Sequence, residues 1–120
     1  MNLPNQRIVY LNGEYVPESE ARIPFRDRGV KYGDAVFDTT RTFGHDIFRL
    51  REHLDRFYRS LKYLRIDPQM SIEDFIAVTE QVVEQNLPLI GKDEDYWVTQ
   101  RVARGLDLVD ATAWPEWEGP

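Results

Sequence analysis

Basic side chains gather in one segment whose spacing could serve a bound anion. Residues 48–66, FRLREHLDRFYRSLKYLRI, carry five arginines and a lysine among apolar residues at helical spacing. Arg56 stands one position from the apolar stripe, so its planar fork could lean over the helix edge and bind a phosphate, with Tyr63 on the same flank. The other interpretation is a solvated helix face, since Glu52 and Arg56 form an acid-first i,i+4 pair. Spacing alone favours the solvated face.

The segment AVFDTTRTF, residues 35–43, offers a second set of candidate side chains. Strand alternation sends Phe37, Thr39 and Arg41 to one face, and Val36, Asp38, Thr40 and Thr42 to the other. The first face could be a pocket wall, with Phe37 against an apolar substrate group and Arg41 near a carboxylate. Alternatively, it is half buried under the helix that follows, with Arg41 extending to solvent. Both interpretations stand at this point.

The remaining polar residues predict neither a metal site nor a catalytic residue. His45 and His53 have no cluster of convergent ligands around them, and cysteine is absent from the sequence, so we interpret both histidines as structural. A lysine that forms a Schiff base must be enclosed by apolar residues, and the sequence gives no such surroundings to Lys31, Lys62 or Lys92. The paired loop acids are interpreted as solvated charges; they are Asp27 with Asp34, and Glu94 with Asp95.

Two hairpins are predicted in the first half of the chain. In residues 8–16, Asn12-Gly13 separates two β-prone runs, as in a type I′ turn. Residues 17–34 contain prolines and glycines among charges and are predicted to be a loop, in which Gly29 and Gly33 occupy turns. The strand at residues 35–43 then reverses at residues 44–46 into IFRL.

The second half predicts two helices and a strand. From Arg51 the apolar residues Leu54, Phe57, Leu61 and Leu64 form one stripe that ends before Pro68. Ser71 and Asp74 resemble a capping box, and a second helical face continues to Pro88. The run YWVTQRVARG, residues 96–105, reads as a strand beside the second hairpin. The predicted fold is α+β: two β-hairpins and a further strand in a small sheet, with two helices packed on one face.

Length and charge exclude several classes of protein. A chain of 120 residues with 42% hydrophobic residues can form one core. The net charge of −6 argues against a sequence-independent nucleic-acid binder. Nowhere do about 18 consecutive apolar residues predict a membrane span. The absence of cysteine makes a cytoplasmic location the simplest expectation.

Taken together, four segments resemble a known family in order and spacing. YLNGEYVP, RDRGVKYGDAVFDTTRTF, IFRLREHLDRFYRSLKYLRI and VARG are similar to the N-terminal domain of class IV aminotransferases, the fold-type IV pyridoxal-phosphate enzymes. The resemblance covers about residues 8–106. It implies an N-terminal small domain at residues 1–106 and an interdomain or truncated tail at residues 107–120.

The resemblance also implies roles for five residues. The second arginine of the REHxxR pattern, Arg56 here, contacts the phosphate of pyridoxal 5′-phosphate in that family. The position of Phe37 lines the substrate pocket, and that of Tyr32 reaches a pocket in the dimer. Arg41 falls on a strand position near the pocket. Thr39 stands where branched-chain enzymes usually have glycine, which bears on pocket size.

The implied function is amino-group transfer between an amino acid, branched-chain-like, or an amine and a 2-oxo acid, in a homodimer. The Schiff-base lysine of the family belongs to a C-terminal domain, so we expect this chain to be the N-terminal part of a longer enzyme and inactive alone. LDLVDA, residues 106–111, stands where D-amino-acid transaminases carry a carboxylate trap, and the Tyr-x-Arg of branched-chain enzymes is not cleanly present in DYWVTQRVARG. The alternative is a stand-alone α+β domain whose hairpin edge or tryptophan-bearing tail binds another protein without catalysis.

Overall fold

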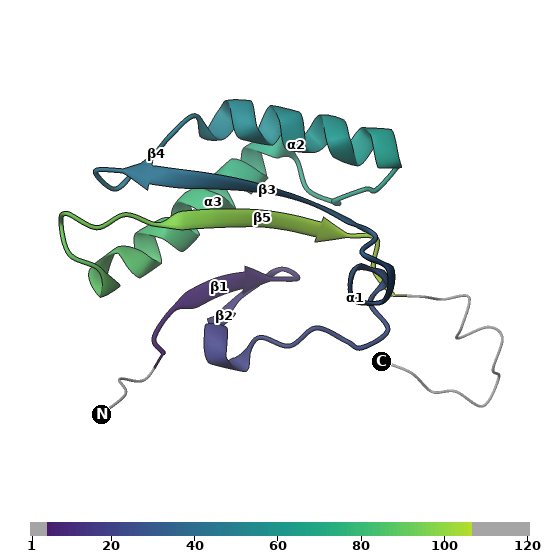
Figure 1. Cartoon of the computed structure of the whole chain (residues 1–120), viewed down its shortest axis with the longest axis horizontal. Helices are drawn as coiled ribbons and strands as arrows, with labels where there is room; N and C mark the ends of the chain where they lie inside the picture. Colours follow the sequence, from purple (N-terminus) through teal and green to yellow (C-terminus); the bar gives the residue numbers. More distant parts are fainter. Residues whose placement is uncertain (1–4, 107–120) are drawn as a thin grey trace, which may run out of the picture.

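The computed structural model of the chain describes residues 5–106 and has the predicted α+β class (Figure 1). Within these residues, five strands form two sheets rather than one, in the orders β1-β2 and β4-β3-β5. The strands are β1 (Ile8–Leu11), β2 (Glu14–Pro17), β3 (Ala35–Phe43), β4 (Asp46–Ile47) and β5 (Trp97–Ala103). The helices are α1 (Arg28–Tyr32), α2 (Leu50–Leu64) and α3 (Ile72–Asn86), with short 3₁₀ turns at Glu18–Glu20 and Leu87–Leu89.

The first predicted hairpin is confirmed. β1 and β2 pair antiparallel with Leu11 opposite Glu14. The two residues between them, Asn12 and Gly13, have φ of 50° and 95°. Positive φ at both positions is what a type I′ turn requires, so the Asn-Gly pair fixes the register of this hairpin.

The second hairpin is confirmed but shorter than expected. β3 pairs with β5 from Ala35↔Ala103 to Arg41↔Trp97, as predicted for the last strand, whereas β4 has two residues. The strand cannot continue through IFRL because Arg49 has φ of 52°, a left-handed conformation that turns the chain into α2 at Leu50.

Helix α2 packs its apolar stripe against β3 and α3. Leu50, Leu54, Phe57 and Leu61 are buried, while Leu64, which the stripe was expected to include, is 42% exposed in the last turn. Side chains of α3, including Phe75, join the same core. The two predicted helices therefore share one core against the larger sheet.

Helix α2 covers one face of β3, and it is not the Phe37 face that we had considered as half buried. Asp38, Thr40 and Thr42 are buried, and Phe37 and Arg41 lie on the exposed face. The alternation was correct, but the suggestion that α2 covers the Phe37 face was wrong. The buried threonine hydroxyls have partners: Thr40 Oγ1 donates to the Val98 carbonyl at 3.2 Å, and Thr42 Oγ1 donates to a loop carboxylate. A row of polar residues can therefore be buried.

Helix α3 has the predicted start and end. The Ser71 side chain accepts a hydrogen bond from the Asp74 backbone N–H at 3.1 Å, which is the N-cap contact of a capping box. The helix ends at Asn86, and Pro88 falls in the following 3₁₀ turn. The local sequence signals therefore specified both ends of this element.

The prediction that residues 17–34 form a loop throughout was wrong. The structure contains a 3₁₀ turn and the five-residue helix α1, which Asp27 caps by accepting from the Val30 backbone N–H at 3.2 Å. Gly33 ends α1 with φ of 68°, but Gly29 is helical rather than a turn residue. A Cβ at Gly29 would lie 2.9 Å from the Ala103 Cβ, so glycine allows α1 to approach β5.

The loop acids are bonded, which corrects their interpretation as solvated charges. Asp34 accepts from Arg28 Nε at 2.9 Å and from Arg104 Nε at 2.7 Å. Asp95 accepts from the Thr42 hydroxyl at 2.7 Å and from the His45 backbone N–H at 2.9 Å. These carboxylates join the ends of β3 to neighbouring loops.

Within residues 5–106, none of the helices combines the length and apolar character that a membrane crossing needs.

Candidate functional site

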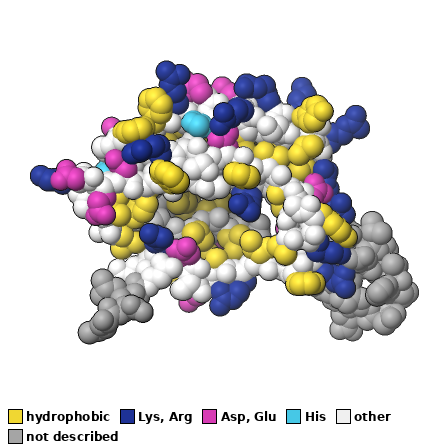
Figure 2. Space-filling view, in the orientation of Figure 1, with side chains coloured by type: hydrophobic (Ala, Val, Ile, Leu, Met, Phe, Trp, Pro, Cys, Tyr) yellow, Lys and Arg dark blue, Asp and Glu magenta, His cyan; other side chains and the backbone are white. Residues whose placement is uncertain are grey.

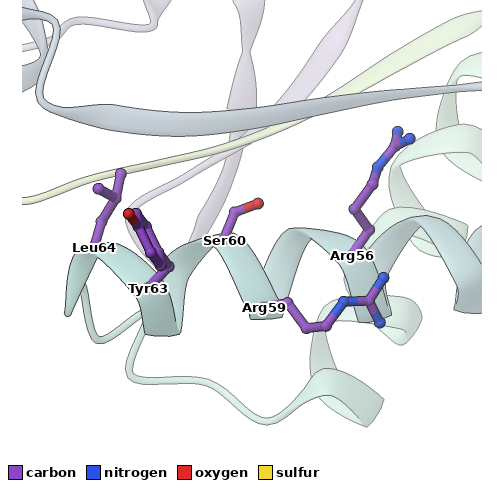
Figure 3. Close-up of a pocket in the computed structure, with 5 residues that line it drawn as sticks. All are labelled: Arg56, Arg59, Ser60, Tyr63 and Leu64. Carbon is purple, nitrogen blue, oxygen red and sulfur yellow. The ribbon is translucent and has the colours of Figure 1, made fainter.

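Arg56 lies on α2 and lines a shallow cavity of about 380 Å³. The other lining residues are Arg59, Ser60, Tyr63 and Leu64 (Figure 3). Figure 3 shows the Arg56 and Ser60 side chains rising from the same side of the helix, one turn apart. As expected from the spacing, Tyr63 borders the same cavity.

The Arg56 guanidinium is held by a carboxylate on the neighbouring strand. Arg56 Nε donates to Asp38 Oδ2 at 3.0 Å and Arg56 Nη2 donates to Asp38 Oδ1 at 2.9 Å. This is the bidentate arrangement that suits a planar guanidinium. The Arg56 side chain is 61% exposed, whereas that of Asp38 is 6% exposed. An exposed cation is therefore attached to a buried anion.

His53 completes this cluster one turn before Arg56 on α2. Its Nδ1 lies 2.9 Å from Asp38 Oδ1, and it donates to the carboxylate when that nitrogen carries the proton. Burial by itself raises the pKa of the Asp38 carboxyl, but the hydrogen bonds from Arg56 and His53 outweigh burial and hold that pKa below its usual range. The hydrogen bonds to Asp38 raise the pKa of Arg56, which stays charged. The interpretation of His53 as a structural residue agrees with this contact.

The bidentate contact leaves part of the guanidinium available. Arg56 Nη1 has no hydrogen-bond partner among the residues that the structure describes, whereas Nη2 donates to Asp38 and also lies 3.3 Å from His53 Nδ1. A second oxyanion can therefore bind the remaining edge of the same guanidinium. Chemically, the cavity can accept a phosphate or a carboxylate.

The candidate substrate residues of β3 lie on the open face of the sheet. Phe37 is 65% exposed, and the guanidinium carbon of Arg101 is 5.5 Å from its ring centroid. The guanidinium carbon of Arg41 is 3.8 Å from the Phe43 ring centroid, which directs Arg41 toward the end of the hairpin. Thr39 Oγ1 and Thr99 Oγ1 are 3.2 Å apart across the strands. Phe37, Thr39 and Arg41 thus share a face, as predicted.

The structure does not bring all the predicted site residues into one cavity. Arg56 contacts the buried face of β3 through Asp38, while Phe37 lies on the opposite face and does not line the Arg56 cavity. Tyr32 lies on α1, 59% exposed, with the Arg28 guanidinium carbon 5.0 Å from its ring centroid. The aromatic that borders the Arg56 cavity is Tyr63.

Asp38 is the site residue that sequence reasoning missed. The alternation placed it on the face opposite Phe37, next to two threonines, without a partner. A carboxylate at a buried strand position is a signal for a cation or hydrogen-bond donor nearby, but the sequence analysis did not predict burial of this face. The Arg56 and His53 positions on the next helix supply those donors.

A second concavity lies between the two sheets. It has a volume of about 1150 Å³ and runs between β1 and β5 over α3 (Figure 2). Figure 2 shows hydrophobic side chains around this hollow. In the described part of the chain, no group of three or more acidic or histidine side chains is arranged to hold a metal ion.

Comparisons with known proteins agree with the resemblance. The family model described as amino-transferase class IV matches residues 35–103. A D-alanine aminotransferase of Staphylococcus aureus is 35% identical over 78 residues, covering 65% of this chain and 28% of that relative. A putative branched-chain-amino-acid aminotransferase of Methanocaldococcus jannaschii is 40% identical over 78 residues, covering 65% of this chain and 27% of that relative.

A solved structure supports the fold as well. The T.th. branched-chain amino acid aminotransferase, complexed with N-(5′-phosphopyridoxyl)-L-glutamate, superposes with a TM-score of 0.70 at 28% identity, covering 80% of this chain and 32% of that chain. The chain thus spans less than a third of the length of each of these three relatives. The family match spans strand β3, helices α2 and α3 and strand β5, the elements that carry Asp38 and Arg56. The chain belongs to the class IV aminotransferases.

Proposed function

We propose that this chain is the N-terminal part of a pyridoxal-phosphate-dependent transaminase that moves an amino group between an amino acid or amine and a 2-oxo acid. The observation that supports this most directly is a charged, exposed guanidinium, Arg56, held by Asp38 beside a cavity. On this proposal Arg56 binds the phosphate of the cofactor. The related structure bound to a phosphopyridoxyl derivative of glutamate makes this cofactor class a reasonable expectation here.

The donor set of the cavity fits a phosphate. The part of the Arg56 guanidinium not bonded to Asp38 offers N–H groups, and Ser60 adds a hydroxyl to the same lining. When bound, pyridoxal 5′-phosphate supplies an electron sink for the carbanion chemistry of amino-group transfer. Arg56 would contribute orientation and charge at the phosphate. The described residues include no enclosed lysine, and we expect the chain to have no transaminase activity alone.

We further propose that Phe37 and Thr39 on the open face of β3 form part of the substrate wall. Phe37 is exposed and apolar, and Thr39 is fixed by its partner Thr99. Arg41 lies farther along the same face, about 13 Å from Phe37 for four residues of strand, and would meet a carboxylate only in a larger pocket. Tyr32 on α1 is proposed to reach a pocket in the dimer.

The amino donor is proposed to be branched-chain-like or an amine. Relatives named as D-alanine and as branched-chain aminotransferases both match the chain at similar coverage. The LDLVDA segment that bears on this choice lies, from residue 107 onward, outside the described residues. The domain boundary at residue 106 also stays a prediction. A homodimer and a cytoplasmic location complete the proposal; the lack of cysteine in the 120 residues is compatible with the latter.

The test is Arg56→Ala in the complete polypeptide that contains this sequence. Loss of a charge-assisted contact to the phosphate should weaken binding of pyridoxamine 5′-phosphate by roughly 1.5–3 kcal/mol, measured by calorimetry. Pyridoxamine, which lacks the phosphate, should bind the variant as it binds the wild type.

Arg59→Ala is the matched control for this test. Arg59 lines the same cavity from the same helix, but it has no hydrogen-bond or ion-pair partner within residues 5–106 to hold it. Its removal should change the affinity for the phosphate compound much less than the removal of Arg56. Wild-type affinity in Arg56→Ala would refute the assignment.

A further inference from the structure

Asp38 has an environment that requires explanation. It lies in the middle of β3 on the face covered by α2, and its residue exposure is 7%. A carboxylate in such a place is costly unless it is hydrogen-bonded and paired with a cation. Asp38 receives both from one helix, because His53 and Arg56 are three residues apart on α2 and converge on its two oxygens.

The contact constrains Arg56 far more than its exposure suggests. Nε and Nη2 of a guanidinium lie along one edge of a rigid plane, so the two bonds to Asp38 fix both the position and the tilt of that plane. The N–H groups of Nη1, which have no partner among the described residues, are then aimed in one direction. A ligand that meets this edge encounters donors already in place.

Arg59 provides a comparison within the same cavity. It lines that cavity beside Arg56, yet no hydrogen bond or ion pair holds its guanidinium among the residues described. Both side chains are long and exposed, so burial does not explain why one is fixed. The difference between them is the carboxylate beneath Arg56.

We propose that Asp38 is a positioning residue for anion binding at Arg56, with His53 contacting Oδ1 of the same carboxylate. This inference rests on the proposed function of Arg56 in binding the cofactor phosphate. Asp38 would not touch the phosphate itself. It would act by holding the guanidinium in the orientation in which the free edge faces the ligand.

Asp38 has two opposing effects on the affinity of Arg56 for an anion, and the larger one decides whether Asp38 strengthens or weakens binding. Its negative charge offsets part of the attraction between Arg56 and an anion. Its two hydrogen bonds remove the rotamer freedom that an exposed arginine otherwise loses when a ligand binds. The bound anion would meet the exposed part of the guanidinium that Asp38 leaves free, where solvent screens the repulsion between the anion and the buried carboxylate, so we expect ordering to win.

The test compares two probes in the complete polypeptide that contains this sequence: pyridoxamine 5′-phosphate and pyridoxamine. The ratio of their affinities isolates the phosphate contribution. Asp38→Asn keeps the shape of the side chain but removes its charge and one acceptor. It should lower the ratio about tenfold, by analogy with the loss seen when a residue that orients a metal-binding side chain is replaced. An unchanged or higher ratio would overturn the proposal.

A double-mutant cycle shows whether Asp38 acts through Arg56. In the Arg56→Ala background, Asp38→Asn should have no further effect on the ratio, since there is no guanidinium left to orient. Additive losses would contradict the proposal. Asp38→Glu should restore most of the ratio, because it retains a charged carboxylate. If Asp38→Asn does not fold, Asp38→Ser provides the same comparison.

Thr40→Val is the matched control. Thr40 is buried two residues away on the same face of β3, and its hydroxyl donates to the Val98 carbonyl rather than to α2. This variant can alter stability but should leave the affinity ratio unchanged. A drop in the ratio equal to that of Asp38→Asn would mean that general loosening of the sheet, and not the carboxylate, is responsible.

A nuclear magnetic resonance measurement separates this inference from the proposed function. The Arg56 Nε–H signal should be sharp and slow to exchange in the wild type and should lose that protection in Asp38→Asn. If Arg56→Ala leaves the affinity ratio unchanged, the proposed phosphate role fails. Loss of the Nε–H protection in Asp38→Asn would still show that Asp38 holds the guanidinium, and retention of the protection would reject that part.

Discussion

At the residue scale, the cluster of Asp38, His53 and Arg56 places charge at the boundary between core and solvent. The carboxylate is inside and the guanidinium is largely outside. Exposed ion pairs contribute little to stability because water screens them, whereas a buried carboxylate without its partners is costly. The cluster is therefore best understood through the buried member, whose ionisation links folding to pH.

The first prediction concerns that link. Because the pKa of Asp38 is lowered in the folded protein, its ionised form stabilises the fold above the unfolded value of about 4. This contribution is lost as the pH falls through the lower folded pKa. Asp38→Asn should therefore reduce the free energy of unfolding at pH 7, and the difference from wild type should shrink at pH below about 4.

Urea unfolding at both pH values measures this difference. Asp93→Asn replaces an exposed carboxylate in the turn before β5 and serves as control, with little expected change in the free energy of unfolding. A deficit in Asp38→Asn that is as large in acid as at neutral pH would point to lost packing rather than to a lost charge.

The placement of individual residues on a strand face or a helix flank was predictable from local sequence patterns. Strand alternation correctly separated Phe37 from Asp38, and helical spacing placed Arg56 and Tyr63 along one cavity. The bond between Asp38 and Arg56 was not predictable in this way. It joins residues 18 positions apart on two elements whose relative placement depends on the whole core.

At the element scale, α2 positions Arg56 and is bounded by two residues in the left-handed conformation. Arg49 precedes the helix with φ of 52°, and Arg65 follows it with φ of 57°. The backbone N–H of Arg65 caps the carbonyls of Leu61 and Lys62. Glycine is the residue that usually occupies the position after a helix, since a Cβ is unfavourable there.

Arg65→Gly should therefore stabilise the protein. Relief of the left-handed strain should raise the free energy of unfolding by about 1 kcal/mol, reduced somewhat by the greater freedom of glycine in the unfolded chain. The Arg65 side chain is exposed, and the Arg104 bond is to the Arg65 carbonyl, which glycine retains. Thermal and urea unfolding measure the change.

Lys62→Gly is the opposite control on the same helix. Lys62 is exposed and helical, so glycine there should lower the free energy of unfolding by about 1 kcal/mol. Equal destabilisation by the two substitutions would show that the conformation of Arg65 is not strained in solution.

The ends of helices and strands were predicted correctly where turn or capping residues mark them in the sequence. Asn12-Gly13 and the Ser71 cap specified a turn and a helix start, and both were correct. Helix α1 was missed because five residues are too few for an apolar period to appear. The short β4 was overestimated because nothing in IFRL indicates the positive φ of Arg49.

At the scale of the whole molecule, the first hairpin belongs to a separate sheet. β1 pairs with β2 and β5 pairs with β3, so the groove of about 1150 Å³ lies where the two sheets do not meet. Sequence patterns predict strands but not which strands share a sheet. For that reason we predicted one sheet where the structure has two. The hairpin is attached instead through contacts of β1 with α3.

Asn86 provides a polar part of that attachment. Its side-chain amide donates to the Ile8 carbonyl at 2.8 Å and accepts from the Ile8 backbone N–H at 2.9 Å. It also donates to the Val82 carbonyl at 2.7 Å, which fixes its orientation at the end of α3. The amide thus pairs with β1 much as a neighbouring strand would, and its residue is 5% exposed.

Asn86→Ala should loosen the hairpin more than the rest of the fold. Removing the amide leaves the Ile8 N–H and C=O without their partner in a partly buried place, at a cost of about 1–3 kcal/mol. Hydrogen exchange should accelerate for the β1 and β2 amides well before those of β3 and α2 respond. Glu84→Ala, on the exposed side of the same helical turn, should leave both sets unchanged. A uniform acceleration across the described elements would mean that the two sheets unfold as one unit, because local opening of the hairpin would spare the core around Leu54 and Phe57.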